Sequence, residues 1–214
     1  MPATPIDSTA AALGPADPQA SGAGELPAKA AGLTDVRTGS AYESARAAIR
    51  SGLAVGAGNR RVSLGNDLVL VFETRETVRS ALEEMLRAER VADPDRIAAE
   101  VAAFEALLAG ERELAATLYV DIADQAALAD RLTELAGIGS AVALEVSGDR
   151  VAARSDGADQ GSGALRLVFA FDEAQRAAVL EGRPVAVVVD HAGCRAAVTL
   201  GGEQSAVIAA GLQR

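Results

Sequence analysis

Two short apolar stretches around one tight turn constrain this chain more than any other feature. Residues 61–64 and 68–72 flank Gly65-Asn66-Asp67, three residues that tolerate the positive φ angles of a tight β-hairpin. The second stretch, Leu-Val-Leu-Val-Phe, is apolar without a break, which is typical of a strand covered on both faces. The sequence therefore predicts a hairpin inside a sheet, with other elements packed on both sides of its second strand.

Three helices are predicted around this hairpin. Ser40 can cap a helix that ends at Ser51-Gly52, and Thr74 can cap a second helix directly after the hairpin. Asp93-Pro94 is a strong start for a third, because Asp caps a helix and Pro suits its first turn. The second and third helices carry apolar residues at helical spacing: Val78, Leu82, Met85 and Leu86, then Ile97, Val101, Phe104 and Leu108. We expect these two helices to pack as a hairpin.

The rest of the chain is richer in strands than in helices. Strand patterns lie at residues 114–122, 142–146, 150–153, 165–171, 185–189 and 196–200, and helix patterns at 124–137, 172–182 and 204–212. In the first of these helices, Leu128, Leu132 and Leu135 are expected to point into the core. Strands that directly follow a strand outnumber strand-helix-strand crossovers, which favours a mixed or largely antiparallel sheet. The predicted class is α+β, with a single domain over residues 39–214.

Residues 1–38 differ in composition from the rest of the chain. They are mostly Pro, Ala, Gly, Ser and Thr, with isolated acidic residues. Such a segment buries too little apolar surface to offset the entropy of ordering it. It is predicted to be a disordered tail that folding does not need.

The charge of the chain argues against two classes of partner. The formal net charge is −10 and the sequence pI is about 4.7. Nucleic-acid binding needs a basic surface, and anionic membranes repel an acidic one. No stretch of the sequence approaches the roughly 20 apolar residues that span a bilayer, and the start lacks the pattern of a secretory signal. We expect a cytoplasmic protein without a nucleic-acid or membrane partner.

Metal and cofactor motifs are not found in the sequence. Cys194 is the only cysteine, which excludes an internal disulfide and a cysteine-cluster metal site. The Gly-rich stretches at 52–58 and 157–163 contain neither a Walker lysine nor the dinucleotide fingerprint. The glutamates of the second and third predicted helices have no histidine one turn away, as a carboxylate di-metal site requires. We expect no metal and no cofactor.

The first candidate site lies where the second strand of the hairpin becomes a helix. Glu73 and Arg75 flank Thr74 there, beside the free N–H groups of a helix N-terminus. Arg60 and Arg61 open the paired strand and can add positive charge, which would suit a carboxylate or phosphate ligand. The alternative is a structural Glu–Arg ion pair that fixes the hairpin to the helix.

The second candidate is the segment Asp190-His191-Ala192-Gly193-Cys194. It brings the only histidine, the only cysteine and an acid together at the end of a predicted buried strand. An acid, a histidine and a thiol can activate a nucleophile or bind a metal. The alternative, which we favour, is a histidine that closes a turn by hydrogen bonding.

Several sequence motifs resemble those of a bacterial family known as domain-of-unknown-function family 3501. The motifs are Asn-Arg-Arg-Val-Ser-Leu-Gly at 59–65, Phe-Glu-Thr-Arg-Glu-Thr at 72–77, Glu-Glu-Met-Leu-Arg-Ala-Glu at 83–89, Ala-Thr-Leu at 116–118, Leu-Arg-Leu-Val-Phe at 165–169 and Asp-His at 190–191. The resemblance covers about residues 59–212. This sequence differs from the family at Arg79-Ser80-Ala81, where family members usually have glutamine, and at Cys194, where they usually have tyrosine.

The resemblance implies an association with a redox or oxidative-stress system that contains a rubrerythrin and an iron–sulfur oxidoreductase. The leading hypothesis is an accessory or binding protein that takes a protein partner of that system or a small anion. The alternative is an enzyme with its site between the Glu73/Arg75 junction and the Asp190/His191 turn. Convergence of these two regions in one pocket would favour the enzyme.

Overall fold

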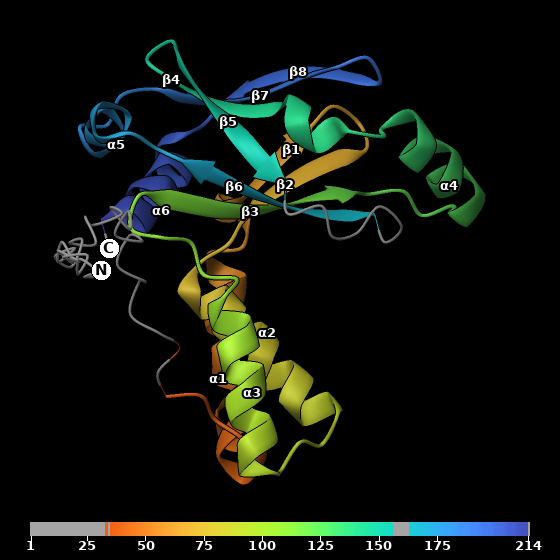
Figure 1. Ribbon diagram of the computed structural model, residues 1–214, viewed down its shortest axis with the longest axis vertical. Helices are drawn as coiled ribbons and strands as arrows, with labels where there is room; N and C mark the ends of the chain where they lie inside the picture. The colour runs from red at the N-terminus through yellow and green to blue at the C-terminus, as the bar shows by residue number, and fades with distance from the viewer. Residues whose placement is uncertain (1–32, 34, 156–162, 214) are drawn as a thin grey trace, which may run out of the picture.

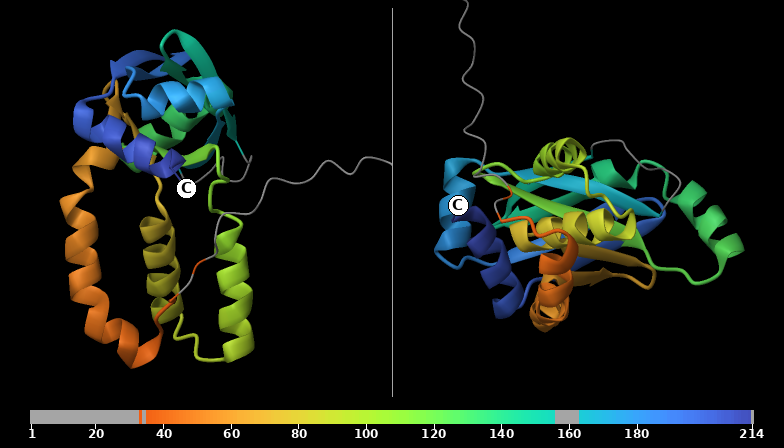
Figure 2. Two further views of the ribbon diagram at one scale, coloured as in Figure 1. Left: turned by 90° about the vertical axis from the view of Figure 1, so that its left-hand side faces the viewer. Right: turned by 90° about the horizontal axis from the view of Figure 1, so that it is seen from below.

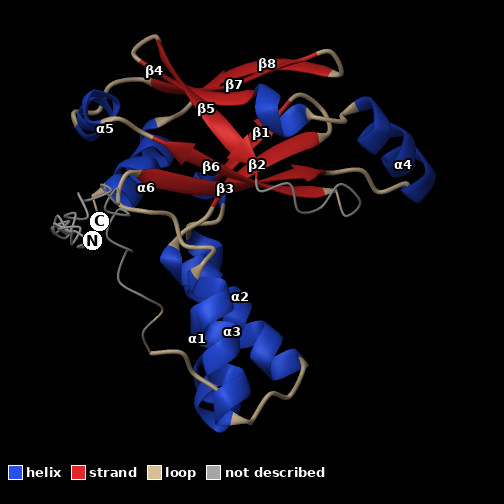
Figure 3. Ribbon diagram, in the orientation of Figure 1, coloured by secondary structure: helices blue, strands red, loops and turns tan. Residues whose placement is uncertain are grey.

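The computed structural model describes residues 33, 35–155 and 163–213, which form an eight-stranded sheet above a layer of three helices (Figures 1 and 3). The strands are β1 (Arg61–Leu64), β2 (Leu68–Phe72), β3 (Glu113–Val120), β4 (Val142–Val146), β5 (Asp149–Ser155), β6 (Ala164–Ala170), β7 (Val185–His191) and β8 (Cys194–Thr199). The helices are α1 (Gly39–Val55), α2 (Arg75–Ala88), α3 (Pro94–Glu105), α4 (Gln125–Glu134), α5 (Glu173–Leu180) and α6 (Gly202–Leu212), with 3₁₀ turns η1 (Gly58–Arg60) and η2 (Ile138–Ala141). The α+β class is confirmed.

The sheet is antiparallel at every described strand pairing. Its order is β1-β2-β3-β6-β5-β4-β7-β8, and the two end strands, β1 and β8, lie against each other. The side-chain amide of Gln204 on α6 also donates to the backbone oxygen of Arg61, at 2.8 Å. The sheet therefore curls towards a barrel, with α6 tied to its first strand.

The main hydrophobic core fills the inside of this curled sheet. Its fully buried side chains include Leu70, Leu144, Leu167, Phe169 and Val187. Helix α6 adds Ile208 and Leu212 to the same core. A Cβ on Gly211 would lie 2.6 Å from Leu114 Cδ2, so this glycine allows α6 to approach β3 closely.

The three helices α1, α2 and α3 lie side by side and project from one side of the sheet (Figure 2). A second, smaller core joins Val78, Leu82 and Leu86 of α2 with half-buried residues of α3, so the predicted α2–α3 hairpin is confirmed. Tyr42 is the one fully buried residue of α1, and α3 has none. Two ion pairs, Arg46–Glu84 and Arg87–Glu43, each at 2.7 Å, join α1 to α2. This layer is therefore less deeply packed than the barrel.

Local signals of the sequence place most element ends correctly. Gly65 has φ +72° in the hairpin turn, and β1 and β2 have the predicted bounds. Thr74 and Thr77 cap each other reciprocally at the start of α2, Asp93 caps α3, and Asp172 forms a capping box with Gln175. Each cap satisfies a backbone N–H that the first turn leaves unpaired.

Both predicted ends of α1 are wrong. Helix α1 begins after Thr38, not Ser40, and runs through Ser51-Gly52 to Val55. Glycine in an exposed helix costs only about 1 kcal/mol of helix stability, which does not end a helix whose next turn continues.

The burial of β2 is less complete than predicted. Val71 of β2 is only half-buried, so the cover expected on both faces of that strand is incomplete.

Leu33 and Arg37, inside the predicted tail of residues 1–38, contact the helical layer. Leu33 is 6% exposed and packs into the core of the helical layer. Its N–H donates to Glu105 Oε1 at 2.9 Å, and the N–H of Arg37 donates to the buried Glu83 at 2.8 Å. Two helix carboxylates and the smaller hydrophobic core therefore hold residues that composition assigned to the tail. Residues 1–32 and 34 lie outside the described part of the chain.

None of the helices in the described ranges combines the length and apolarity that a membrane span needs.

Candidate functional site

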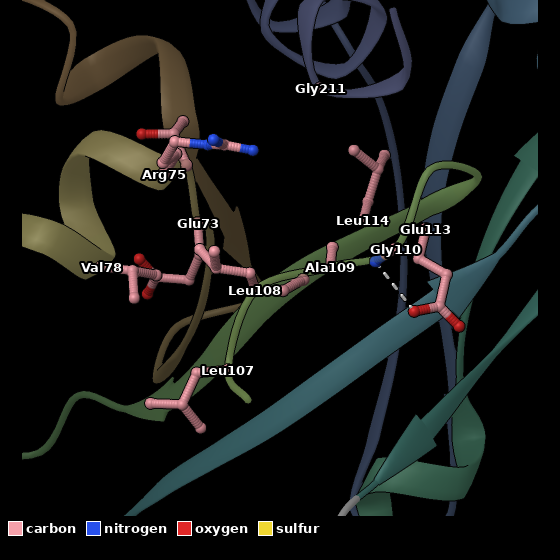
Figure 4. A pocket seen from close by; sticks show the side chains of 12 residues that line it. Glu73, Arg75, Val78, Leu107, Leu108, Ala109, Gly110, Glu113, Leu114 and Gly211 are labelled. Carbon is pink, nitrogen blue, oxygen red and sulfur yellow. Dashed lines mark hydrogen bonds between the residues drawn. The ribbon is translucent and has the colours of Figure 1, made fainter. Parts of the chain in front are cut away.

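The strand-to-helix junction after β2 forms a small pocket (Figure 4). Glu73 extends the pairing of β2 with β3, because its N–H donates to the oxygen of Ala115 at 2.8 Å. Its carboxylate accepts one hydroxyl from Thr77, at 2.7 Å, and one from Thr117, at 3.0 Å. Glu73 thereby joins β2, α2 and β3, and its charge lies beside the N-terminus of α2, where a negative charge is favourable.

The size and charge of this junction pocket do not suit an anion. Its volume is about 30 Å³, roughly the space of one water. Its described lining includes two carboxylates, Glu73 and Glu113, and one guanidinium, that of Arg75. Glu113 is in turn held by the N–H of Gly110 at 3.1 Å and by Arg154 at 2.5 Å. The charged groups that the sequence predicted at this junction are present, but the pocket has little room for a ligand.

The two arginines at the start of β1 point to other partners. Arg60 donates to the backbone oxygen of Leu53 at 3.2 Å. Arg61 pairs with Asp121 at 2.9 Å, with both side chains about half exposed. Neither arginine lines the junction pocket. The structure therefore does not gather Arg60, Arg61 and Arg75 around one anion position.

His191 closes the turn between β7 and β8. Its Nδ1 accepts the N–H of Gly193 at 3.0 Å, and its Nε2 lies 3.1 Å from the oxygen of Ala136. An Nδ1 that accepts places the ring proton on Nε2, which then donates to Ala136. Asp190 is not a hydrogen-bond partner of the ring and pairs with Arg195 across the strands, at 3.3 Å and well exposed. This geometry matches the turn-closing alternative for the histidine.

The two candidate regions lie at opposite ends of β2. Glu73 follows the last residue of that strand. Cys194 lies beside Gly65 at the other end, where a Cβ on that glycine would be 3.9 Å from Cys194 Sγ. A strand of five residues is about 17 Å long. The single pocket that the enzyme alternative requires is therefore not formed by these residues.

A much larger cavity lies beneath α4, at a place that the sequence did not single out. Its volume is about 600 Å³, and it opens to solvent. Helix α4 and η2 form one wall, and the ends of β3, β5 and β6 form the other. The residues that line it are Leu118, Val120, Ala129, Leu132, Thr133, Leu135, Ala136, Gly137, Ile138, Gly139, Ser140, Ser155, Gly163, Ala164 and Leu165.

Among the described residues of the lining, the polar groups are few and uncharged. The hydroxyl of Thr133 donates to the oxygen of Ala129 at 3.1 Å, and that of Ser140 donates to Gly137 at 2.9 Å. Both hydroxyl oxygens keep a lone pair for a further donor. The cavity can therefore hold an apolar molecule and accept an occasional hydrogen bond from it.

Comparison with known proteins gives a family. The family model described as "Protein of unknown function (DUF3501)" matches residues 32–212. The chain belongs to the DUF3501 family. It is also similar to a crystal structure described as a novel protein of unknown function from Burkholderia pseudomallei K96243, with 29% sequence identity and a TM-score of 0.75. That match covers 80% of this chain and 93% of the other. No curated protein matches this chain.

The family match confirms the resemblance seen in the sequence and extends it towards the N-terminus, to residue 32. Neither description names a function. Over the described residues, no group of three or more His, Cys, Asp or Glu side chains is placed to hold a metal ion.

The sequence of this DUF3501 chain held only one indirect sign of the cavity. Leu128 and Leu132 were expected to enter the core, but both are only half-buried in α4. Leu132 lines the cavity instead, and Leu128 lies near Gly163 at its rim. An apolar helical stripe predicts an apolar neighbour and does not distinguish a filled core from a hollow one.

Cys194 is expected to react slowly with iodoacetamide at neutral pH. Burial raises the pKa of its thiol, and the negative charge of Asp67 raises it further, while Arg131 opposes this in part. The thiolate, which is the reactive form, is therefore scarce at pH 7. Labelling followed by mass spectrometry from pH 5 to 10 should show a rate that still climbs above pH 8.5. A plateau below pH 7 that His191→Ala abolishes would instead identify an activated nucleophile.

Proposed function

We propose that this DUF3501 protein is a non-catalytic binding protein whose ligand is a small, uncharged, apolar molecule held in the cavity under α4. The supporting observation is the cavity itself. At about 600 Å³ it falls within the roughly 300–1,000 Å³ of known small-molecule sites, and its lining is mostly apolar with a few hydroxyls. That combination is typical of ligand pockets.

The chemistry of the lining selects against a charged ligand. None of the described lining residues carries a formal charge. A charged group taken into such a place would lose its hydration without gaining a counter-ion, at a cost of several kcal/mol. An apolar ligand instead gains about 25 cal/mol for each Å² of apolar surface removed from water.

The sequence between Ser155 and Gly163 is mostly polar. Residues 156–162, Asp-Gly-Ala-Asp-Gln-Gly-Ser, join Ser155 to Gly163 at the rim of the cavity. The methyl group of Ala158 is the only apolar side chain in that segment. The proposed occupant is a separate, apolar molecule whose chemistry fits the described lining.

An uncharged naphthyl fluorophore, N-phenyl-1-naphthylamine, tests the proposal. Its fluorescence should rise on titration with the full chain and saturate at one site per chain, because the cavity removes the dye from water. The anionic dye 1-anilinonaphthalene-8-sulfonate has a similar ring system and should bind far more weakly. Equal binding of the two dyes, or no saturation with the uncharged one, would contradict the proposal.

A pair of tryptophan substitutions on α4 locates the dye. Ala129→Trp fills part of the cavity and is expected to weaken binding at least about tenfold, which is about 1.4 kcal/mol. Ala127→Trp is the matched control, because Ala127 is exposed on α4 and does not line the cavity. Circular dichroism should show the same helix content in both. Equal loss in the two variants would place the dye elsewhere.

The accessory role beside a redox system and the cytoplasmic location are the finer parts of this proposal. They are supported by the family resemblance and by the single cysteine, which suits a reducing compartment, respectively. Copurification of the tagged chain from its host, followed by mass spectrometry, tests the first. A rubrerythrin or an iron–sulfur oxidoreductase should be enriched over a control with an unrelated acidic protein.

A further inference from the structure

The shape of the cavity depends on where the C-terminal end of α4 is held. Helix α4 stands out from the barrel in Figure 1, and Leu128 and Leu132 on it remain half exposed. Ala136, two residues beyond the end of the helix, lines the cavity with Leu135. A small movement of this end would change the width of the cavity directly.

One clamp holds α4 to the turn between β1 and β2. Arg131 donates from Nε and from a terminal nitrogen to the two carboxylate oxygens of Asp67, and it also pairs with Glu134 at 2.8 Å. Bidentate pairs of this kind fix geometry as well as adding stability. This clamp acts on the last turns of the helix but not on the cavity-lining residues that follow it.

A second clamp comes from the turn between β7 and β8, through His191. Its Nε2–H donates to the oxygen of Ala136, and its Nδ1 is held by the N–H of Gly193. The backbone of Gly193 is itself close to α4: a Cβ there would lie 3.0 Å from the oxygen of Glu134 and 3.3 Å from Leu135 Cδ2. The absence of a side chain lets the turn sit against the helix end.

We infer that His191 is a positioning residue for the ligand cavity: the β7–β8 turn sets the place of the Leu135–Ala136 wall through the hydrogen bond from His191 to Ala136. If the cavity binds a ligand, as proposed above, the position of this turn sets the ligand affinity; this consequence rests on the proposed function. The His191 side chain itself does not line the cavity. Its effect on a ligand is therefore indirect.

Two substitutions separate the two hydrogen bonds of the ring. His191→Asn keeps an acceptor near Nδ1 that can close the turn onto the N–H of Gly193, as asparagine does in Asx-turns, but it loses the donor to Ala136. His191→Gln keeps a donor near Nε2 and loses the turn closure. His191→Asn is expected to weaken naphthylamine binding about 3- to 10-fold, the effect of one hydrogen bond, while His191→Gln stays close to the unmodified protein.

A second measurement tests the positioning role without any ligand. The chain has no tryptophan, so Ala127→Trp places a single fluorescent reporter on α4. Combined with His191→Asn, the reporter should show lower steady-state anisotropy and faster quenching by acrylamide than it does alone or with His191→Gln. Such a difference reports a looser α4.

The outcomes distinguish the two proposals. If the unmodified protein does not bind the dye but His191→Asn loosens α4, the ligand function fails and the positioning role stands. If the dye binds normally to His191→Asn and the anisotropy of the reporter does not change, the positioning role is overturned while the ligand function stands. Equal loosening by His191→Asn and His191→Gln would also overturn it, because the bond to Ala136 would then not be the cause.

Discussion

Phe169→Ala is expected to lower the free energy of unfolding by about 3–5 kcal/mol, the usual cost of removing a fully buried aromatic ring. Phe169 is 0% exposed and lies in the middle of the sheet, opposite Leu114 of β3 and Ala153 of β5. Its ring is part of the core inside the curled sheet, where the neighbouring strands are fixed by hydrogen bonds on both sides. The structure around it can therefore collapse little into the space that the ring leaves.

Phe104→Ala is the matched control, since it removes the same ring from the helical layer. Phe104 is only half-buried at the edge of the smaller core. About 1 kcal/mol is expected there, because less apolar surface returns to water. Urea unfolding of both variants measures the difference, with the slope m unchanged if the denatured state is the same. Similar losses in the two variants would contradict the assignment of the main core to the barrel.

Leu33→Ala is expected to cost about 2–3 kcal/mol, although composition places this residue in a dispensable tail. Leu33 is 6% exposed and packs with Val78, Leu82, Leu86 and Val91. Its loss leaves an apolar hole in a core that is already small. The cost falls below the upper end for leucine because a terminal segment can partly resettle over the hole.

Two truncated chains test where the folded part of the protein begins. A chain that begins at Leu33 is expected to keep its stability within about 0.5 kcal/mol. A chain that begins at Gly39 also loses the contacts of Arg37 with the buried Glu83 and should be destabilised at least as much as Leu33→Ala. Thermal and urea unfolding would show this directly. Equal stability of the two truncated chains would restore the boundary at residue 38.

The predictions from sequence succeeded where the signal was local. The hairpin of β1 and β2, the caps at Thr74, Asp93 and Asp172, and the pairing of α2 with α3 all depend on residues within a few positions of one another. A turn glycine or a capping side chain acts on backbone groups that its own segment brings near. Such signals remain valid whatever the rest of the chain does.

The candidate residues show the opposite case. Glu73 and His191 were chosen because of their chemistry and their place at strand ends, and both do occupy strand ends. Their partners, Thr117 and Ala136, lie 44 and 55 positions away, respectively. No pattern in the sequence indicates such a partner. For that reason, the sequence could name these residues but not say whether they share a pocket.

By itself, the sequence determined the α+β class, the positions of the hairpin turn and the helix caps, and the family. These follow from hydrophobic periodicity, from turn and capping residues, and from recognisable sequence motifs, respectively. Only the tertiary structure decided that the sheet curls on itself, that Leu33 belongs to the helical core, and that Leu132 of α4 faces a cavity. The physical reason is common to all three. An apolar pattern in the sequence shows which side chains are buried away from water. The surface against which they pack depends on segments that are distant in the sequence.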